Sequence, residues 1–229
     1  MKLDLLDSYN IRVRLSANII LFAPIAITVL QCFPDTTTLA SSTVFVAILL
    51  AFTNYTTLLQ RRINQNKIYY INYAARYLEA SDNTLDPVTK LRYYSILAKT
   101  NPSFSPFNQP NDSEQFKECC ASAVVFLKTK TRENNLVKEE NINYGFCKSL
   151  YGCKKIGIFI CLSLSLFILI YWKIQFGSFS ETPSTIFFAF FFNLGMLLFW
   201  CFGITNEMVD EAAQRYAKRL LSMIDTLKP

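Results

Sequence analysis

Four stretches of the chain contain no charged residue, and each is long enough to cross a lipid bilayer as a helix. They are Leu15–Phe33, Thr43–Leu59, Ile156–Trp172 and Ile186–Ile204. The apolar core of a bilayer needs roughly 17–25 helical residues. The residues outside these stretches are too few to cover four fully apolar helices in water. The sequence therefore predicts an all-helical, polytopic membrane protein with four transmembrane helices paired as two hairpins.

The first stretch has an alternative interpretation as a secretory signal peptide, because small residues follow it at Thr37–Ser42. Two observations disfavour it. The lead-in Met1–Arg14 is long and contains Asp4 and Asp7. The apolar run also exceeds the roughly 7–15 residues of a typical signal core. An uncleaved first transmembrane helix is the better prediction.

The basic residues predict which side of the membrane each segment faces. Of the 23 Lys and Arg residues, three precede the first stretch, fifteen lie in 61–155 and four follow the last stretch. Only Lys173 falls in a predicted outer loop. Because cytoplasmic loops carry the excess of basic residues, both termini and the middle domain are predicted to be cytoplasmic.

This topology divides the chain into five predicted segments. They are a cytoplasmic N-terminal segment (1–14), a first transmembrane hairpin (15–60), a cytoplasmic helical domain (61–155), a second hairpin (156–204) and a cytoplasmic C-terminal helix (205–229). The net charge of +6 follows mostly from the same topology. It therefore points to the lipid bilayer as a partner, and direct binding of nucleic acid is not expected.

The cytoplasmic domain carries three local signals. Asp86 followed by Pro87 is typical of a helix start, with a helix through about Lys99. Three prolines in Asn101–Ser113 predict an exposed, irregular connection. In Ser113–Lys130, apolar residues recur at helical spacing and predict a central helix with one buried face. That face consists of Phe116, Cys120, Val124 and Leu127.

The C-terminal segment Glu207–Leu227 is amphipathic and needs an apolar partner. Its candidate partner face contains Tyr216, Leu220, Ile224 and Leu227. The face can pack on the Ser113–Lys130 helix of the same chain, or on the same tail of a neighbouring subunit in a homo-oligomer. The pattern alone does not choose between these two arrangements.

The composition disfavours most familiar chemistries. Histidine is absent, which removes the commonest general base and histidine metal sites. No Gly-rich phosphate loop is present. The pairs Cys119–Cys120 and Cys147 with Cys153 lack the spacing of zinc knuckles. We therefore predict no enzyme activity, no catalytic residue, no metal ligand and no cofactor.

The polar side chains inside the apolar stretches include three asparagines, Asn18, Asn54 and Asn193. An amide in hydrocarbon needs a hydrogen-bond partner, so Asn54 and Asn193 are candidate interhelical contacts. The alternative is that they line a polar path through the membrane. No acid or base lies deep in a stretch, which disfavours a proton-coupled pump.

The segment Glu140–Gly157 reads Glu-Asn-Ile-Asn-Tyr-Gly-Phe-Cys-Lys-Ser-Leu-Tyr-Gly-Cys-Lys-Lys-Ile-Gly. Together with Thr84–Pro87 and Leu5–Arg14, it resembles an uncharacterised family of bacterial four-span inner-membrane proteins. The resemblance implies a four-span topology, a bacterial origin and a place in the inner (plasma) membrane. It implies no particular activity. The segment also contains a candidate coupling elbow, in which glycines permit turns before the third span. Its residues are Asn141, Tyr144, Gly145, Phe146 and Gly152.

These observations predict a non-enzymatic membrane sensor or effector, whose cytoplasmic domain controls its spans in phage defence or a stress response. Two alternatives stay open. The first is a membrane anchor or scaffold that recruits a cytoplasmic partner protein. The second is a membrane enzyme acting through Asp86, Arg92, Glu140 or Tyr144.

Overall fold

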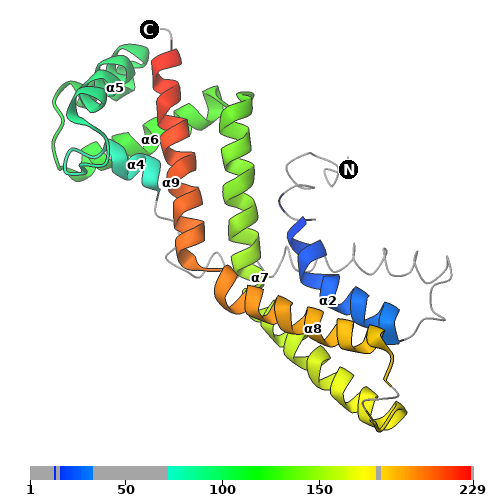
Figure 1. The fold of residues 1–229 in the computed structure, drawn as a ribbon. Coiled ribbons are helices and arrows are strands. Elements are labelled where there is room, and N and C mark those ends of the chain that lie inside the picture. Colours follow the sequence, from blue (N-terminus) through cyan, green and yellow to red (C-terminus); the bar gives the residue numbers. More distant parts are fainter. Residues whose placement is uncertain (1–12, 14–15, 33–71, 179–181, 228–229) are drawn as a thin grey trace. The chain divides into compact units, whose positions relative to one another are not determined.

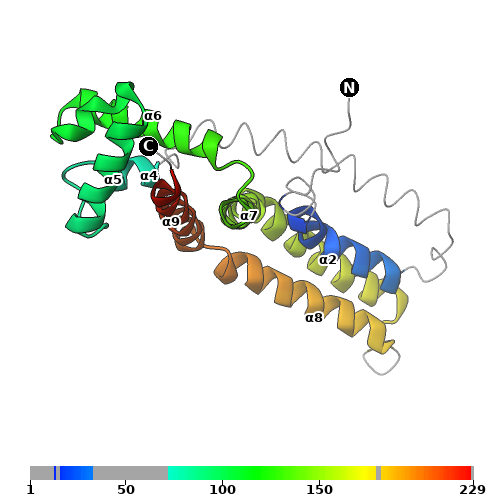
Figure 2. The ribbon, with the colours of Figure 1, turned by 90° about the horizontal axis from the view of Figure 1, so that it is seen from above.

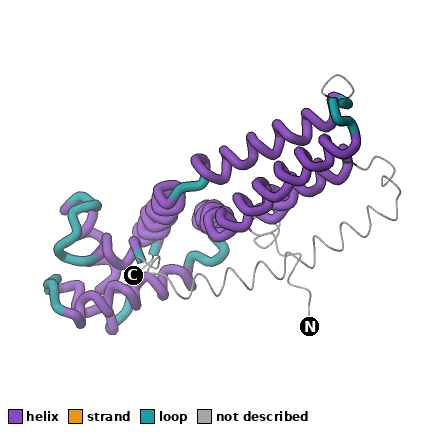
Figure 3. Tube along the Cα trace, turned by 90° about the horizontal axis from the view of Figure 1, so that it is seen from below, coloured by secondary structure: helices purple, strands orange, loops and turns teal. Residues whose placement is uncertain are grey.

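The computed structural model describes residues 13, 16–32, 72–178 and 182–227. Within these ranges every regular element is a helix and none is a strand (Figure 3). The predicted all-helical class is therefore confirmed for the described part of the chain.

The chain divides into two compact units, each made of two segments. Unit 1 is Met1–Lys67 with Gly145–Met208, and unit 2 is Ile68–Tyr144 with Val209–Pro229.

Unit 1 contains helix α2 (Ser16–Cys32), most of helix α7 (Asn135–Gln175), helix α8 (Ser184–Leu198) and the π-helix η6 (Phe199–Gly203). Two helical segments are long and apolar enough to cross a membrane, namely 135–175 and 184–203. Only 22% of the most apolar window of each is buried, whereas the core helix of a soluble protein is mostly buried. Helix α2 is apolar but shorter. The predicted second span, Thr43–Leu59, lies outside the described residues.

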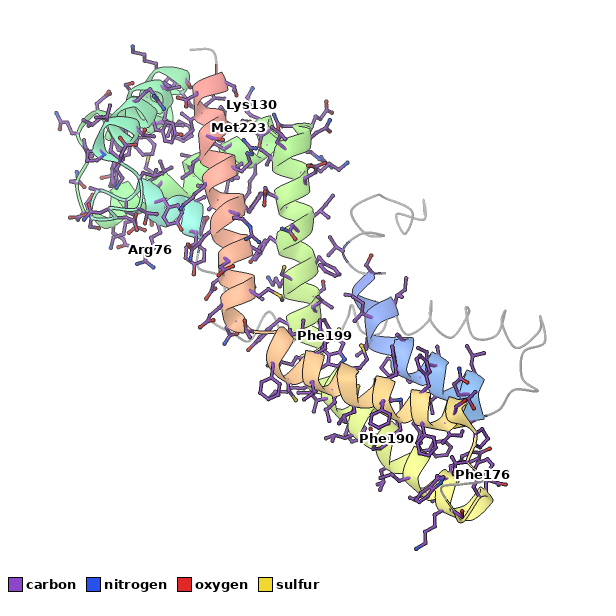
Figure 4. The ribbon with its side chains drawn as sticks, in the orientation of Figure 1. Arg76, Lys130, Phe176, Phe190, Phe199 and Met223 are labelled. Carbon is purple, nitrogen blue, oxygen red and sulfur yellow. The ribbon has the colours of Figure 1, made fainter. Side chains whose placement is uncertain are left out.

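The three helices of unit 1 lie side by side (Figures 1 and 2) and share two apolar clusters. Cluster A contains Ala17, Leu21, Phe22, Leu150, Cys153, Cys161, Trp200 and Ile204. Cluster B contains Cys32, Ile168, Ile186 and Ala189, with Phe176 and Phe190 (labelled in Figure 4) packed against it. The outer faces remain apolar, because Phe159, Ile174 and Phe202 are 70–76% exposed. Exposed apolar surface of this kind suits contact with lipid.

Unit 2 contains α4 (Tyr73–Leu78), α5 (Pro87–Thr100), η4 (Pro102–Asn108), α6 (Glu114–Lys130), the start of α7, most of α9 (Asn206–Ser222) and η7 (Met223–Thr226). Helix α5 begins where the sequence predicts, because the Asp86 side chain accepts a hydrogen bond from the backbone N–H of Thr89 at 2.9 Å. Ser113 caps α6 in the same way, through the N–H of Phe116.

One core holds unit 2 together, and it draws on both segments of the chain. The predicted face of α6, Phe116, Cys120, Val124 and Leu127, is buried in it. The Tyr94 ring stacks on Phe107 with ring centroids 5.3 Å apart, and it meets Phe116 edge to face at 5.8 Å. From the end of the chain, Leu220 and Ile224 are fully buried in the same core.

The predicted connection after α5 differs from the structure. The prolines after α5 predict an exposed and irregular connection, but Pro102–Asn108 forms a 3-10 helix whose Phe104 and Phe107 side chains are 2% exposed. Those two rings supply apolar area that the core needs. Most of the C-terminal helix, from Val209 on, belongs to the same compact unit as Ile68–Tyr144, and its apolar face is part of that unit's core.

Candidate functional site

A layer of polar side chains crosses unit 1 between its two apolar clusters. On α8, Asn193 is fully buried, and its amide Nδ2 donates to the hydroxyl of Thr28 on α2 at 2.9 Å. The same Nδ2 donates to the carbonyl of Ala189 at 2.8 Å. Thr28 in turn donates to the carbonyl of Pro24 at 2.8 Å. A hydrogen-bonded chain therefore joins α8 to α2 inside the apolar unit.

We infer from the positions of the clusters that α7 contributes Ser165 at about the same level. In α2, Thr28 lies between Phe22 of cluster A and Cys32 of cluster B; in α7, Ser165 lies between Cys161 and Ile168 of the same two clusters. Two atoms of this layer, Asn193 Oδ1 and Ser165 Oγ, are buried without a hydrogen-bond partner among the described residues. An unpaired polar atom in apolar surroundings is costly. The layer can therefore accept water or another donor more readily than the clusters on either side.

Among the predicted interhelical contacts, Asn193 thus contacts α2 through Thr28. Asn54 lies outside the described residues. Sequence reasoning overlooked Thr28 and Ser165, because hydroxyl side chains are common in membrane helices and can satisfy themselves within their own helix.

The candidate coupling elbow contains no turn. Asn141, Tyr144, Gly145, Phe146 and Gly152 all lie inside α7, which is helical throughout from Asn135 to Gln175. A glycine costs a helix only about 1 kcal/mol relative to alanine. The helix on both sides is long enough to tolerate two of them.

The boundary between the two units nevertheless falls inside this segment, between Tyr144 and Gly145. On the unit 2 side, the Tyr144 ring stacks on Tyr216 of α9, with centroids 6.2 Å apart and planes 9° apart. On the unit 1 side, Phe146 packs against cluster A. One continuous helix therefore contributes to the packing of both units.

The candidate partner face of the C-terminal helix is covered by its own chain. Leu220 and Ile224 are buried in the core of unit 2, and Tyr216 and Leu227 pack against that core. The side chains of Arg92 on α5 and Asp225 on η7 form an ion pair with a 3.0 Å Nε–Oδ1 distance. This packing corresponds to the arrangement within the chain that the amphipathic pattern allows.

The four residues considered as candidates for an enzyme site make different contacts in the structure. Asp86 caps α5, Arg92 pairs with Asp225, and Tyr144 stacks on Tyr216. Glu140 lies in α7, where its Oε2 atom is buried without a hydrogen-bond partner in the described part of the chain. Among the described residues, no group of three or more His, Cys, Asp or Glu side chains could hold a metal ion.

Charge is unevenly divided between the units. Unit 2 contains thirteen basic and twelve acidic residues, whereas unit 1 contains ten basic and five acidic residues. The excess positive charge therefore belongs to the unit that holds the apolar helices. Unit 2 itself carries only one more basic than acidic residue.

The adjacent cysteines of α6 offer a test of the unit 2 core. Cys119 and Cys120 are 8% and 0% exposed, and burial raises the pKa of both thiols, that of Cys120 to about 12. Because the thiolate is the reactive form, neither should react with a maleimide at pH 7.5 until unit 2 unfolds. Ser122→Cys, at an exposed position of the same helix, should react at once. Equal labelling rates at positions 120 and 122 in the folded protein would contradict the buried position of Cys120.

Comparison of the chain with protein-family models, with curated proteins and with solved structures finds no match. The fold and the polar layer therefore define a class, an all-helical protein with membrane-length helices, and its function has to be argued from its own residues.

Proposed function

We propose that this chain is a non-enzymatic effector of the bacterial inner membrane, in which a cytoplasmic unit controls the state of the spans. In this proposal four spans form two hairpins, both termini and unit 2 are cytoplasmic, and the protein acts as a homo-oligomer in phage defence or a stress response. The family resemblance and the bacterial origin that it implies remain predictions.

The observation that carries the proposal is the continuity of α7. Its first residues belong to unit 2, where Val137 is buried in the core and Tyr144 stacks on Tyr216. The same helix continues as the apolar segment that packs on α2 and α8. A signal that changes the packing of unit 2 therefore acts on a helix that also lines the polar layer, without an intervening flexible loop.

The polar layer supplies a way for the spans to respond. Asn193 and Thr28 hold α8 to α2 by a side-chain hydrogen bond, and two further polar atoms there lack partners among the described residues. Separation of the helices at this level would expose hydroxyl and amide groups that water can solvate. The effector would thus raise permeability when the hydrogen bond opens.

The proposal predicts that induced expression of the wild-type chain depolarises bacterial cells and that Asn193→Leu abolishes this effect. Leucine keeps the size of the side chain but removes both the donor and the unpaired acceptor, so separated helices would present no amide at position 193 for water to solvate. The matched control is Asn206→Leu, at an exposed position at the start of α9, which should depolarise cells like the wild type. A voltage-sensitive dye and viable counts measure the outcome, with membrane fractions showing equal amounts of each variant.

Failure of the wild-type chain to change the membrane potential under every inducing condition would overturn the proposal. Truncation after Asn206 would confound this assay. The shortened chain lacks Leu220 and Ile224, so it loses part of the core of unit 2 as well as the C-terminal helix.

A membrane scaffold is the second candidate, and the exposed face of α5 favours it. Val88 and Leu91 are 75% and 62% exposed, three residues apart on one helix. Helical neighbours at this spacing form a small apolar surface that a partner protein could cover. The scaffold reading predicts a copurifying protein that is lost from the double variant Val88→Ser and Leu91→Ser, together with an unchanged membrane potential.

A further inference from the structure

The end of α8 is a π-helix, and the side chains around it suggest that it has two alternative states. Phe199–Gly203 forms this element directly after α8. A π-turn holds one more residue than the same stretch of α-helix, and such turns occur frequently at functional sites. Helix α9 begins at Asn206, only a few residues further along the chain.

A tryptophan ring keeps the π-turn against α7. Trp200 lies in the turn and is fully buried in cluster A. Its ring occupies the space next to Gly157 of α7, where a Cβ atom would overlap with the indole. Glycine is therefore required at 157 as long as Trp200 takes this position.

A lysine holds the same turn from one helical turn away. Lys154 precedes Gly157 by three residues on α7, and its ammonium donates to the carbonyls of Cys201 at 3.1 Å and Ile204 at 2.7 Å. Carbonyls at the end of a helix lack partners within the helix, and a positive charge is favourable there. Lys154 thus stabilises the π-turn by satisfying two of them.

One atom opposes this state. The indole Nε1 of Trp200 is buried and has no hydrogen-bond partner among the residues that the structure describes. A buried unpaired donor destabilises the conformation that contains it. The contacts of Lys154 and the unpaired indole therefore have opposite effects on the same five residues, which brings a state without the π-turn closer in free energy.

We propose that Phe199–Gly203 is a register switch, in which Lys154 and the Trp200–Gly157 contact hold the π-turn and their release converts it to α-helix. When the π-turn becomes α-helix, every residue after it shifts by one helical position. This shift is a rotation of about 100° around the helix axis. The chain would then leave the turn toward α9 from a different side of the helix axis. This inference rests on the proposed function, since it names the device by which the spans and unit 2 would affect each other.

The test uses the full-length protein in lipid vesicles with Trp172→Phe, so that Trp200 is the remaining tryptophan. In the π-state the ring faces α7 and should be protected from quenching by lipids with brominated acyl chains. Lys154→Met removes the ammonium and keeps the length of the side chain, so protection should be lost. Lys155→Met, at the exposed neighbouring position, should retain it. Deletion of Phe202, which is 76% exposed, removes one residue from the turn and should also expose Trp200.

Equal protection in the wild type, Lys154→Met and Lys155→Met would overturn the register switch, provided that circular dichroism shows equal helix content. If the deletion variant does not fold, the comparison of the two lysine variants still decides the question. The quenching result does not depend on depolarisation. Loss of protection in a protein that never depolarises cells would keep the switch and reject the proposed effector function.

Discussion

Replacing Leu220 by alanine should destabilise unit 2 by about 2–5 kcal/mol, the usual cost of a buried Leu→Ala change. Leu220 is fully buried in the core that α9 shares with α6. The matched control is Leu91→Ala, because Leu91 is 62% exposed in the same unit and its loss leaves no cavity. For Leu91→Ala, the free energy of unfolding should change by no more than about 0.5 kcal/mol.

Urea-dependent labelling of Cys120 provides the measurement, since this thiol becomes accessible when unit 2 unfolds. The urea concentration at the midpoint of labelling should be lower for Leu220→Ala and unchanged for Leu91→Ala. Equal midpoints for both variants would mean that the face of α9 does not belong to this core. The face would then be available to a neighbouring subunit, the other arrangement that the amphipathic pattern allows.

Two glycine-to-alanine changes in unit 1 should have opposite effects on the stability of the protein. Gly157→Ala places a methyl group against the Trp200 ring, and overpacking of this kind costs about 1–3 kcal/mol. In the described part of the chain, no atom lies within 4 Å of a Cβ added at Gly195 in α8. Alanine there should stabilise the helix by up to about 1 kcal/mol, because it has the higher helix propensity.

The thermal stability of the two variants in detergent micelles measures this difference, with the wild type as reference. Gly157→Ala should melt at a lower temperature and Gly195→Ala at an equal or higher one. A stabilised Gly157→Ala variant would show that Trp200 does not lie against α7. That result would also remove one of the two contacts on which the register switch depends.

Local signals predicted the local structure well. The Asp86–Pro87 pair marks the start of α5, and the apolar spacing of Phe116 and Leu127 identifies the buried face of α6. Both signals depend on the helix period and on capping, which act within a few residues. The apolar runs likewise predicted the two membrane-length helices, because length and hydropathy alone define such a helix.

Features that depend on distant residues were not predictable in this way. Gly145 and Gly152 suggested turns, yet packing on both sides keeps α7 helical. The prolines of η4 suggested an exposed connection, but Phe104 and Phe107 are needed in the core. The contacts of Lys154 had no local signal, since its carbonyl partners lie about fifty residues further along the chain.

The interleaving of the two units also has a consequence for how the protein is made. Unit 2 is interrupted by Gly145–Met208, and its core is completed by side chains that are synthesised after this interruption, among them Leu220 and Ile224. Helices α7 and α8 are therefore synthesised, and in the proposed topology inserted, before unit 2 can close. A nascent chain would expose the apolar faces of α5 and α6 throughout that interval. Any proposed control of the spans by unit 2 could begin only after α9 has been synthesised.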